Sequence, residues 1–299
     1  MTTRSVVIFD GDVPLAGRIH RQSEDPFEPQ PAVIVMGSWL TVKEQMADGY
    51  AAALAKRGYT AVTFDFSGFG ASGGTLRQAE APARKVSNIA AVVDLVSRLS
   101  YVRPGGPGVL AICASAQYSL EAMARGVRVA SFASVAGWFH DARSVAGFYG
   151  GADGVSARLD RGAAATDHYL ATGEVRTVPA YAVGDETAGM FIDMDYYSNP
   201  ARGAIPEWRN EMAELTWSHW LTYNGLIAAR SVDVPTIFVH SDGCVFPDNI
   251  KAIASQLAGP VDTVWGDGTQ IDFYDQPKQM AFALDAVDAH FKTTLGVSA

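Results

Sequence analysis

Short apolar runs separate segments of helical periodicity along this chain. Examples of these runs are Ala32–Met36, Thr60–Phe66 and Gly108–Ile112. A strand that is apolar at nearly every position is buried on both faces, as in parallel sheets that helices cover on both sides. The alternation of such strands with helices predicts right-handed βαβ units and an α/β fold built on a mostly parallel sheet.

The same patterns place the other elements. We predict a hairpin of strands 6–9 and 15–20, helices over 43–57, 84–99, 116–125, 247–257 and 277–291, and strands over 127–135, 235–240 and 261–265. Residues 141–230 lack strand-like runs and are rich in aromatic side chains. We therefore expect a core of residues 1–140 and 231–299, with residues 141–230 inserted as a mostly helical cap whose aromatic residues pack on the core or line a pocket.

Charge and composition limit the function. A net charge of -9 and a pI near 5.1 argue against a nucleic acid or an anionic membrane as partner. No apolar run is long enough to cross a bilayer, and the N-terminus does not resemble a signal peptide. Because the chain has two cysteines, we do not expect a disulfide framework, and we expect a cytoplasmic location. We expect no metal and no cofactor, since the glycine-rich loop 68–74 lacks a phosphate-binding pattern.

The segment Gly108–Gln117 has the layout of a nucleophile elbow, in which a strand turns sharply into a helix. Small residues, Ala111 and Ser115, lie two positions before and after Cys113, so the motif reads A-x-C-x-S in place of G-x-S-x-G. Cys113 is the candidate nucleophile, and the start of a helix is expected to lower the pKa of its thiol. Two alternatives remain: Cys113 is a buried, inert thiol, or Ser115 is the nucleophile.

Triad chemistry also needs an acid and a base. Asp242 follows the strand 235–240 and is the candidate acid, or else a residue that orders the turn. The loop after the last strand contains no histidine, and Gln270 occupies the place where the base is expected. A glutamine cannot take up a proton near neutral pH. Trp138, Trp217 and His219 are candidate pocket residues, and His219 is also a candidate substitute base.

Four motifs in this order resemble the α/β-hydrolase superfamily, and within it the dienelactone-hydrolase-like and YcjY-like proteins. The motifs are 32–45, 64–74, 112–115 and 272–275. The resemblance implies an eight-stranded sheet, a nucleophile at Cys113 and an acid at Asp242. It also implies an oxyanion hole made by the N–H group of Ala114 with that of Trp39 or Leu40. The sequence departs from the family pattern at Gln270, where a catalytic histidine is expected.

Three functional hypotheses follow. The first is an enzyme that attacks a small ester, lactone or thioester through Cys113. The second is a lyase, isomerase or cyclase that uses the same pocket without a full triad, and the third is a catalytically silent protein that binds a small ligand. In each case we expect a neutral, apolar or aromatic small molecule as the partner. A homo-oligomer is compatible with the sequence, which does not define the oligomeric state.

Overall fold

The structure, a computed structural model, describes residues 1–23, 25 and 27–296. Its central sheet has eight strands in the order β1-β2-β4-β3-β5-β6-β9-β10. Pairs β1–β2 and β2–β4 are antiparallel and the other neighbours are parallel. The predicted sheet is thereby confirmed. The strands are β1 (Thr2–Asp10), β2 (Val13–Arg21), β3 (Ala32–Met36), β4 (Thr60–Phe64), β5 (Gly108–Ile112), β6 (Ser131–Val135), β9 (Thr236–Gly243) and β10 (Val261–Thr269).

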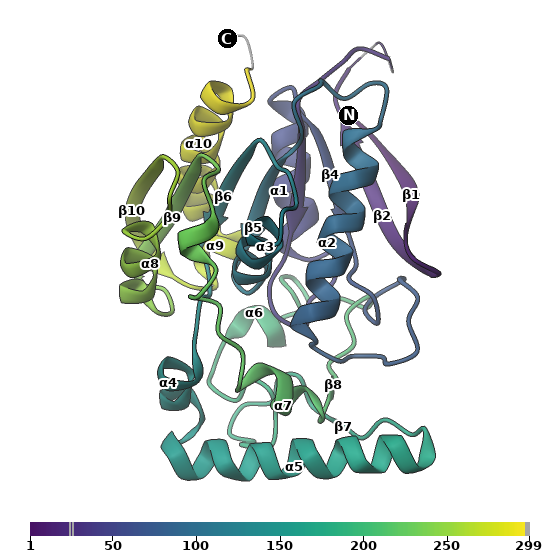
Figure 1. Cartoon of the computed structure of the whole chain (residues 1–299), viewed down its shortest axis with the longest axis vertical. Coiled ribbons are helices and arrows are strands. Elements are labelled where there is room, and N and C mark those ends of the chain that lie inside the picture. Colours follow the sequence, from purple (N-terminus) through teal and green to yellow (C-terminus); the bar gives the residue numbers. More distant parts are fainter. Residues whose placement is uncertain (24, 26, 297–299) are drawn as a thin grey trace.

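Helices cover both faces of this sheet (Figure 1). Helices α1 (Met46–Lys56) and α10 (Pro277–Thr294) contact each other on one face, and α2 (Pro82–Ser97) and α3 (Ser115–Ala124) contact each other on the other. Helix α8 (Pro247–Ala254) packs against β9 and β10. Strands β3, β4, β5 and β6 are buried at every position, which is why their sequences are so uniformly apolar.

The segment between β6 and β9, which we call the cap, lies beyond the carboxyl ends of the parallel strands (Figure 1). Its one long helix, α5 (Gly151–Thr172), runs along the outer side, and the rest of the segment consists of short elements and loops. The short elements are α4 (Ala142–Val145), η1 (Ala146–Tyr149), β7 (Thr177–Val178), α6 (Asp195–Ser198), β8 (Met212–Ala213), α7 (Thr216–Trp220) and η2 (Ala229–Ser231).

Several boundaries differ from the prediction. Strand β9 continues to Gly243 and β10 to Thr269, whereas β6 starts at Ser131. Helix α1 starts at Met46, three residues later than predicted, and Lys43 binds Asp65, which directly follows β4. The Lys43 N–H and ammonium groups lie 2.8 and 2.6 Å from the two carboxylate oxygens. The buried carboxylate of Asp65 also accepts the Ala71 N–H group, so Asp65 orders the glycine-rich loop.

Within the described part of the chain, no helix is both long and apolar enough to cross a membrane.

Candidate functional site

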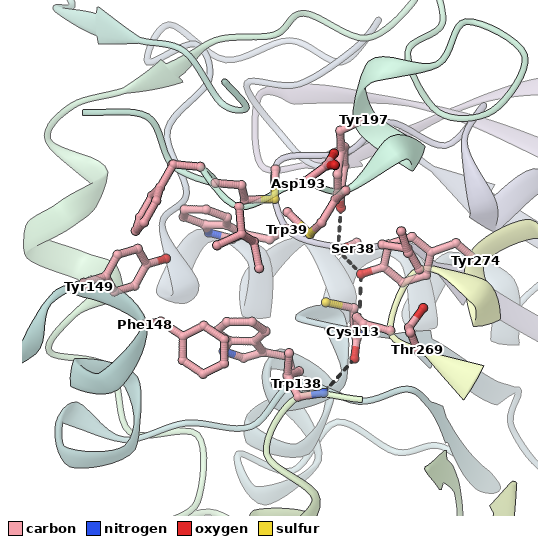
Figure 2. A pocket seen from close by; sticks show the side chains of 18 of the residues that line it. Ser38, Trp39, Cys113, Trp138, Phe148, Tyr149, Asp193, Tyr197, Thr269 and Tyr274 are labelled. Atoms are coloured by element: carbon pink, nitrogen blue, oxygen red, sulfur yellow. Dashed lines mark hydrogen bonds between the residues drawn. The ribbon is translucent and has the colours of Figure 1, made fainter. Parts of the chain in front are cut away.

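Cys113 forms a sharp turn between β5 and α3. Its φ of +60° lies in the left-handed region, which costs a non-glycine residue on the order of 1 kcal/mol or more. The surrounding backbone fixes this conformation: the Cys113 N–H group donates to Val135 (3.2 Å) and its carbonyl accepts the N–H group of Trp138 (3.0 Å). The turn expected from the A-x-C-x-S spacing is present, and it directs the Cys113 side chain toward the cap (Figure 2).

Ser115, the rival nucleophile, is used by the turn itself. Its hydroxyl accepts the Ile112 N–H group at 3.1 Å and lies 3.2 Å from the Met36 carbonyl. The side chain is buried beneath the turn and does not line the pocket. Ser115 therefore stabilises the elbow.

A cavity of about 310 Å³ opens above Cys113, between the strand ends and the cap. The core contributes Ser38, Trp39 and Trp138, and the loop after β10 contributes Gln270 and Tyr274 (Figure 2). The cap supplies the opposite wall, with Phe148, Tyr149, residues 189–194, Tyr197 and Trp220. Among the lining residues that the structure describes, Asp193 is the single charged side chain, and it is exposed. The cavity therefore suits a neutral, largely apolar molecule.

The backbone N–H groups of Trp39 and Ala114 lie close enough to the Cys113 sulfur to favour its thiolate form. An oxyanion formed next to this sulfur would lie within reach of the same two donors. Leu40, the other candidate donor, is not available, because its N–H group donates to a Glu80 carboxylate oxygen at 3.3 Å. The prediction of Leu40 as an oxyanion donor is therefore wrong.

A buried ion pair supports the loop that carries Trp39. The Glu80 carboxylate binds the Lys85 ammonium group at 2.7 Å, the Tyr118 hydroxyl at 2.7 Å and the Leu40 N–H group. The Lys85 ammonium also lies over the rings of Phe66 and Tyr118. Glu80 and Lys85 are almost fully buried, and this burial lowers the pKa of Lys85 against the effect of Glu80. The pair thereby holds Leu40 in its left-handed conformation, with φ of +58°.

The thiol of Cys113 is more basic than the sequence suggested. Burial raises its pKa, and hydrogen bonds from Ser38, Tyr274 and the two backbone N–H groups only partly oppose that effect. The expectation of a lowered pKa is wrong, because the side chain is 3 % exposed and loses most of its hydration. Cys113 is therefore a neutral thiol near pH 7.

Asp242 does not reach Cys113. Its side chain is 77 % exposed, accepts the Trp265 indole N–H group at 3.0 Å and lies 3.8 Å from the Lys251 ammonium. The physical reason is that β9 runs past residue 240, so Asp242 belongs to the strand and not to the loop that faces the pocket. The placement of Asp242 beside the nucleophile is corrected accordingly.

Gln270 lines the pocket, and every polar atom of its amide has a partner. The amide oxygen accepts the Val245 N–H group at 3.2 Å, and the nitrogen donates to the Ala136 carbonyl at 2.6 Å and to the Tyr274 hydroxyl at 3.4 Å. Gln270, which follows β10, thereby connects Ala136 after β6 with Val245 after β9. Gln270 thus orients its neighbours and has no capacity to accept a proton.

A chain of hydroxyl groups that we did not predict lies beside the thiol. The Tyr197 hydroxyl donates to Ser38 at 3.3 Å, and Ser38 lies 3.0 Å from the Tyr274 hydroxyl (Figure 2). Ser38 and Tyr274 line the cavity beside Cys113, and both hydroxyl groups favour its thiolate form. The sequence signal for Tyr274 is its spacing of four residues, about one helical turn, from Gln270, which links these two side chains but does not indicate a contact with Cys113.

Of the three predicted pocket residues, only Trp138 lines the cavity. Trp217 is fully buried behind Trp39, with ring centroids 6.4 Å apart, and His219 is exposed. Both placements are corrected. In helix α7 the side chains of Trp217 and Trp220 turn inward, which leaves the intervening His219 on the solvent side.

His140 holds two walls of the pocket together. Its Nδ1 accepts the Trp138 indole N–H group at 2.7 Å, so the ring proton resides on Nε2 and is donated to the Trp220 carbonyl at 2.8 Å. Burial lowers the pKa of His140 to about 4. Protonation of His140 would place an Nδ1–H group opposite the Trp138 indole N–H group, which is also a donor. His140 therefore stays neutral and links Trp138 to Trp220.

This arrangement predicts acid sensitivity. Because the pKa of His140 falls from about 6.5 in the unfolded chain to about 4 in the folded one, its contribution is complete above pH 6.5 and is lost as the pH falls toward 4. On account of this group, the free energy of unfolding is expected to be about 2 kcal/mol lower at pH 5 than at neutral pH. Urea titration at the two pH values measures the difference. His140→Gln should remove that part of the pH dependence, and His168→Gln on α5 should keep it. Equal pH slopes for wild type and His140→Gln would refute this account.

An arginine clamps the cap to the loop after β10. The Arg202 guanidinium binds the Asp275 carboxylate, the Ile271 carbonyl at 3.0 Å and the Asp195 carboxylate of α6. Asp275 ends α9 (Asp272–Asp275), the short helix that carries Tyr274. The side of the pocket that contains Tyr274 is therefore tied directly to the cap.

Within residues 1–23, 25 and 27–296, no group of three or more acidic, histidine or cysteine side chains is arranged to hold a metal ion.

The sequence resembles parts of two curated proteins, and no family model matches it. YcjY of Escherichia coli K12 is 35% identical over 114 residues, which are 35% of this chain and 37% of YcjY. PA2218 of Pseudomonas aeruginosa PAO1 is 36% identical over 99 residues, which are 33% of this chain and 27% of PA2218. In both cases the similarity spans well under half of the curated relative.

Solved structures resemble the whole chain. The crystal structure of the hypothetical protein PA2218 from Pseudomonas aeruginosa has a TM-score of 0.84 at 22% identity, covering 98% of this chain and 94% of that one. The alpha/beta hydrolase GrgF from Penicillium sp. sh18 has a TM-score of 0.79 at 18% identity, covering 99% of each chain. At these identities the likeness concerns the fold.

Proposed function

Since this chain has the α/β-hydrolase fold, we propose that it is an enzyme that acts on a small ester, lactone or thioester through Cys113. The observation that carries the proposal is a cysteine held at φ of +60° in a sharp strand-to-helix turn that lines an apolar cavity, with the Trp39 and Ala114 N–H groups near its sulfur. Attack by that sulfur on a carbonyl carbon would form a thioester with the enzyme. The two N–H groups would stabilise the oxyanion of the tetrahedral intermediate.

The acyl group that fits is neutral and apolar or aromatic. Trp39, Trp138, Phe148 and Trp220 surround the cavity, whose volume of about 310 Å³ suits a small acyl chain. The exposed Asp193 carboxylate disfavours an anionic substrate. A 3-phenylpropanoyl group is a suitable probe of this chemistry.

The proposal is tested by mapping the adduct on the intact protein. We expect the N-acetylcysteamine thioester of 3-phenylpropanoate to add one acyl group, which peptide mass spectrometry locates on Cys113. Cys244 is the internal control, because it is also buried, its pKa is raised to about 11 by burial, and it does not line the pocket. Cys244→Ser should be acylated like wild type. No adduct on Cys113, with the thioester bound and unchanged, would favour a ligand-binding protein instead.

A second candidate, a transferase or cyclase that excludes hydrolysis, is favoured by Gln270. Because its amide cannot take up a proton, Gln270 does not supply the base that a catalytic histidine would provide for discharge of the acyl group to water. The acyl-enzyme is then consumed by a nucleophile that the substrate or a second molecule supplies. Persistence of the adduct in buffer, with rapid discharge on addition of a thiol acceptor, would support this function over hydrolysis.

A further inference from the structure

We propose that Tyr274 is a catalytic residue that moves the proton in the reaction of Cys113, in the role left open by the missing histidine. This inference rests on the proposed function of Cys113. Tyr274 is 2 % exposed, comes from helix α9 after β10 and lines the cavity together with Cys113 and Ser38, and its hydroxyl lies close enough to the sulfur to favour the thiolate form. Among the residues that line the described cavity there is no histidine, and the one carboxylate, Asp193, is exposed.

The neighbours of Tyr274 leave its oxygen able to accept one proton and to donate another. The Gln270 amide is fixed by Val245, whose N–H group occupies the amide oxygen, so its nitrogen donates to the Tyr274 oxygen. Ser38 accepts a hydrogen bond from Tyr197 and lies 3.0 Å from the Tyr274 hydroxyl, a contact in which either oxygen can be the donor. With the Gln270 donor on one lone pair, the Tyr274 oxygen has a second lone pair that can accept the thiol proton, while its own O–H group can donate to the leaving atom. Figure 2 shows the Tyr274 hydroxyl between Ser38 and Cys113.

The proton transfer balances without another reactant. As the sulfur–carbon bond forms, the thiol proton passes to the Tyr274 oxygen, and the original Tyr274 hydroxyl proton passes to the leaving oxygen or sulfur. The bond from the carbonyl carbon to that atom then breaks, and Tyr274 ends as a neutral phenol. Burial raises the pKa of Tyr274 well above its usual range, which keeps it a neutral group that accepts one proton while it donates another.

The leaving group provides the test. We compare acylation of Cys113 by the ethyl and p-nitrophenyl esters of 3-phenylpropanoate, since p-nitrophenolate departs without a proton and an alkoxide does not. In Tyr274→Phe the ratio of the ethyl to the p-nitrophenyl rate is expected to fall about 100-fold, which is the typical effect of losing a general acid.

Tyr50→Phe is the matched control. Tyr50 is also buried, and its hydroxyl donates to the neighbouring Phe273 carbonyl at 2.7 Å, outside the pocket. Its ratio should stay within about threefold of wild type.

A merely structural role of Tyr274 would lower both acylation rates equally and leave their ratio unchanged, and that result would overturn its catalytic role.

The wild-type pH profile is a second measurement, and it does not depend on whether the variant folds. Acylation by the ethyl ester should be nearly flat from pH 6 to 8, whereas attack by a thiolate would rise tenfold for each pH unit. A tenfold rise per unit would overturn the inference. Failure of both esters to acylate wild-type Cys113 would instead overturn the proposed function.

Discussion

Cys113→Ala is expected to reduce turnover of a 3-phenylpropanoyl thioester at least about 1,000-fold, because the variant keeps the pocket but has no atom that can hold the acyl group. The side chain occupies a tight turn, and alanine fits the same space without its sulfur. The rate of thioester consumption, followed by the release of free thiol, measures the effect.

Cys113→Ser is expected to be nearly as inactive. A serine hydroxyl at neutral pH needs a strong base, and neither Gln270 nor the displaced Asp242 supplies one. Cys244→Ser serves as the control for the loss of a buried thiol and should retain turnover. Wild-type rates in Cys113→Ala would eliminate Cys113 as the nucleophile.

Lys85→Met is expected to cost about 3–5 kcal/mol of unfolding free energy, since it leaves the buried Glu80 carboxylate without its cation. Chemical denaturation measures this loss. The matched control is Arg98→Met at the C-terminal end of the same helix, α2, because Arg98 and Asp94 form an exposed ion pair at i and i+4. Its loss should cost less than about 1 kcal/mol.

The double variant Glu80→Leu/Lys85→Met tests whether the cost comes from the unpaired charge. Removing both charges should recover part of the lost stability, because an uncompensated carboxylate is more costly in the core than two apolar side chains. The Leu40 N–H group would still lose its acceptor, so recovery should be incomplete. A double variant that is less stable than Lys85→Met would contradict this explanation.

The fold and the position of Cys113 could be predicted because each depends on a local pattern. Strands β3 and β5 have the predicted bounds, since a strand that is buried on both faces must be apolar throughout. The small residues Ala111 and Ser115 likewise indicated the turn at Cys113 directly.

The partners of Cys113 were harder to predict because they depend on side-chain direction. The prediction for Asp242 was wrong because β9 extends three residues beyond the predicted end at 240, which places Asp242 on the solvent side, and composition does not reveal this extension. Tyr274 was present in the motif 272–275 but was not recognised as a partner, since only the three-dimensional fold brings it to Ser38, 236 residues earlier in the chain.

The clamp at Arg202 has a consequence for how a substrate reaches the sulfur. Lifting α6 away from the core would either break the ion pair with Asp275 or pull α9 along, and with it the hydroxyl of Tyr274. A cap that opened like a hinge would thus dismantle the site at each turnover. We therefore expect the substrate to enter past Ile192 and Asp193, two exposed residues of the cavity wall. Rotation of these two side chains would admit it while the cap stays in place. Diffusion through this entrance would then favour slender acyl chains over branched ones.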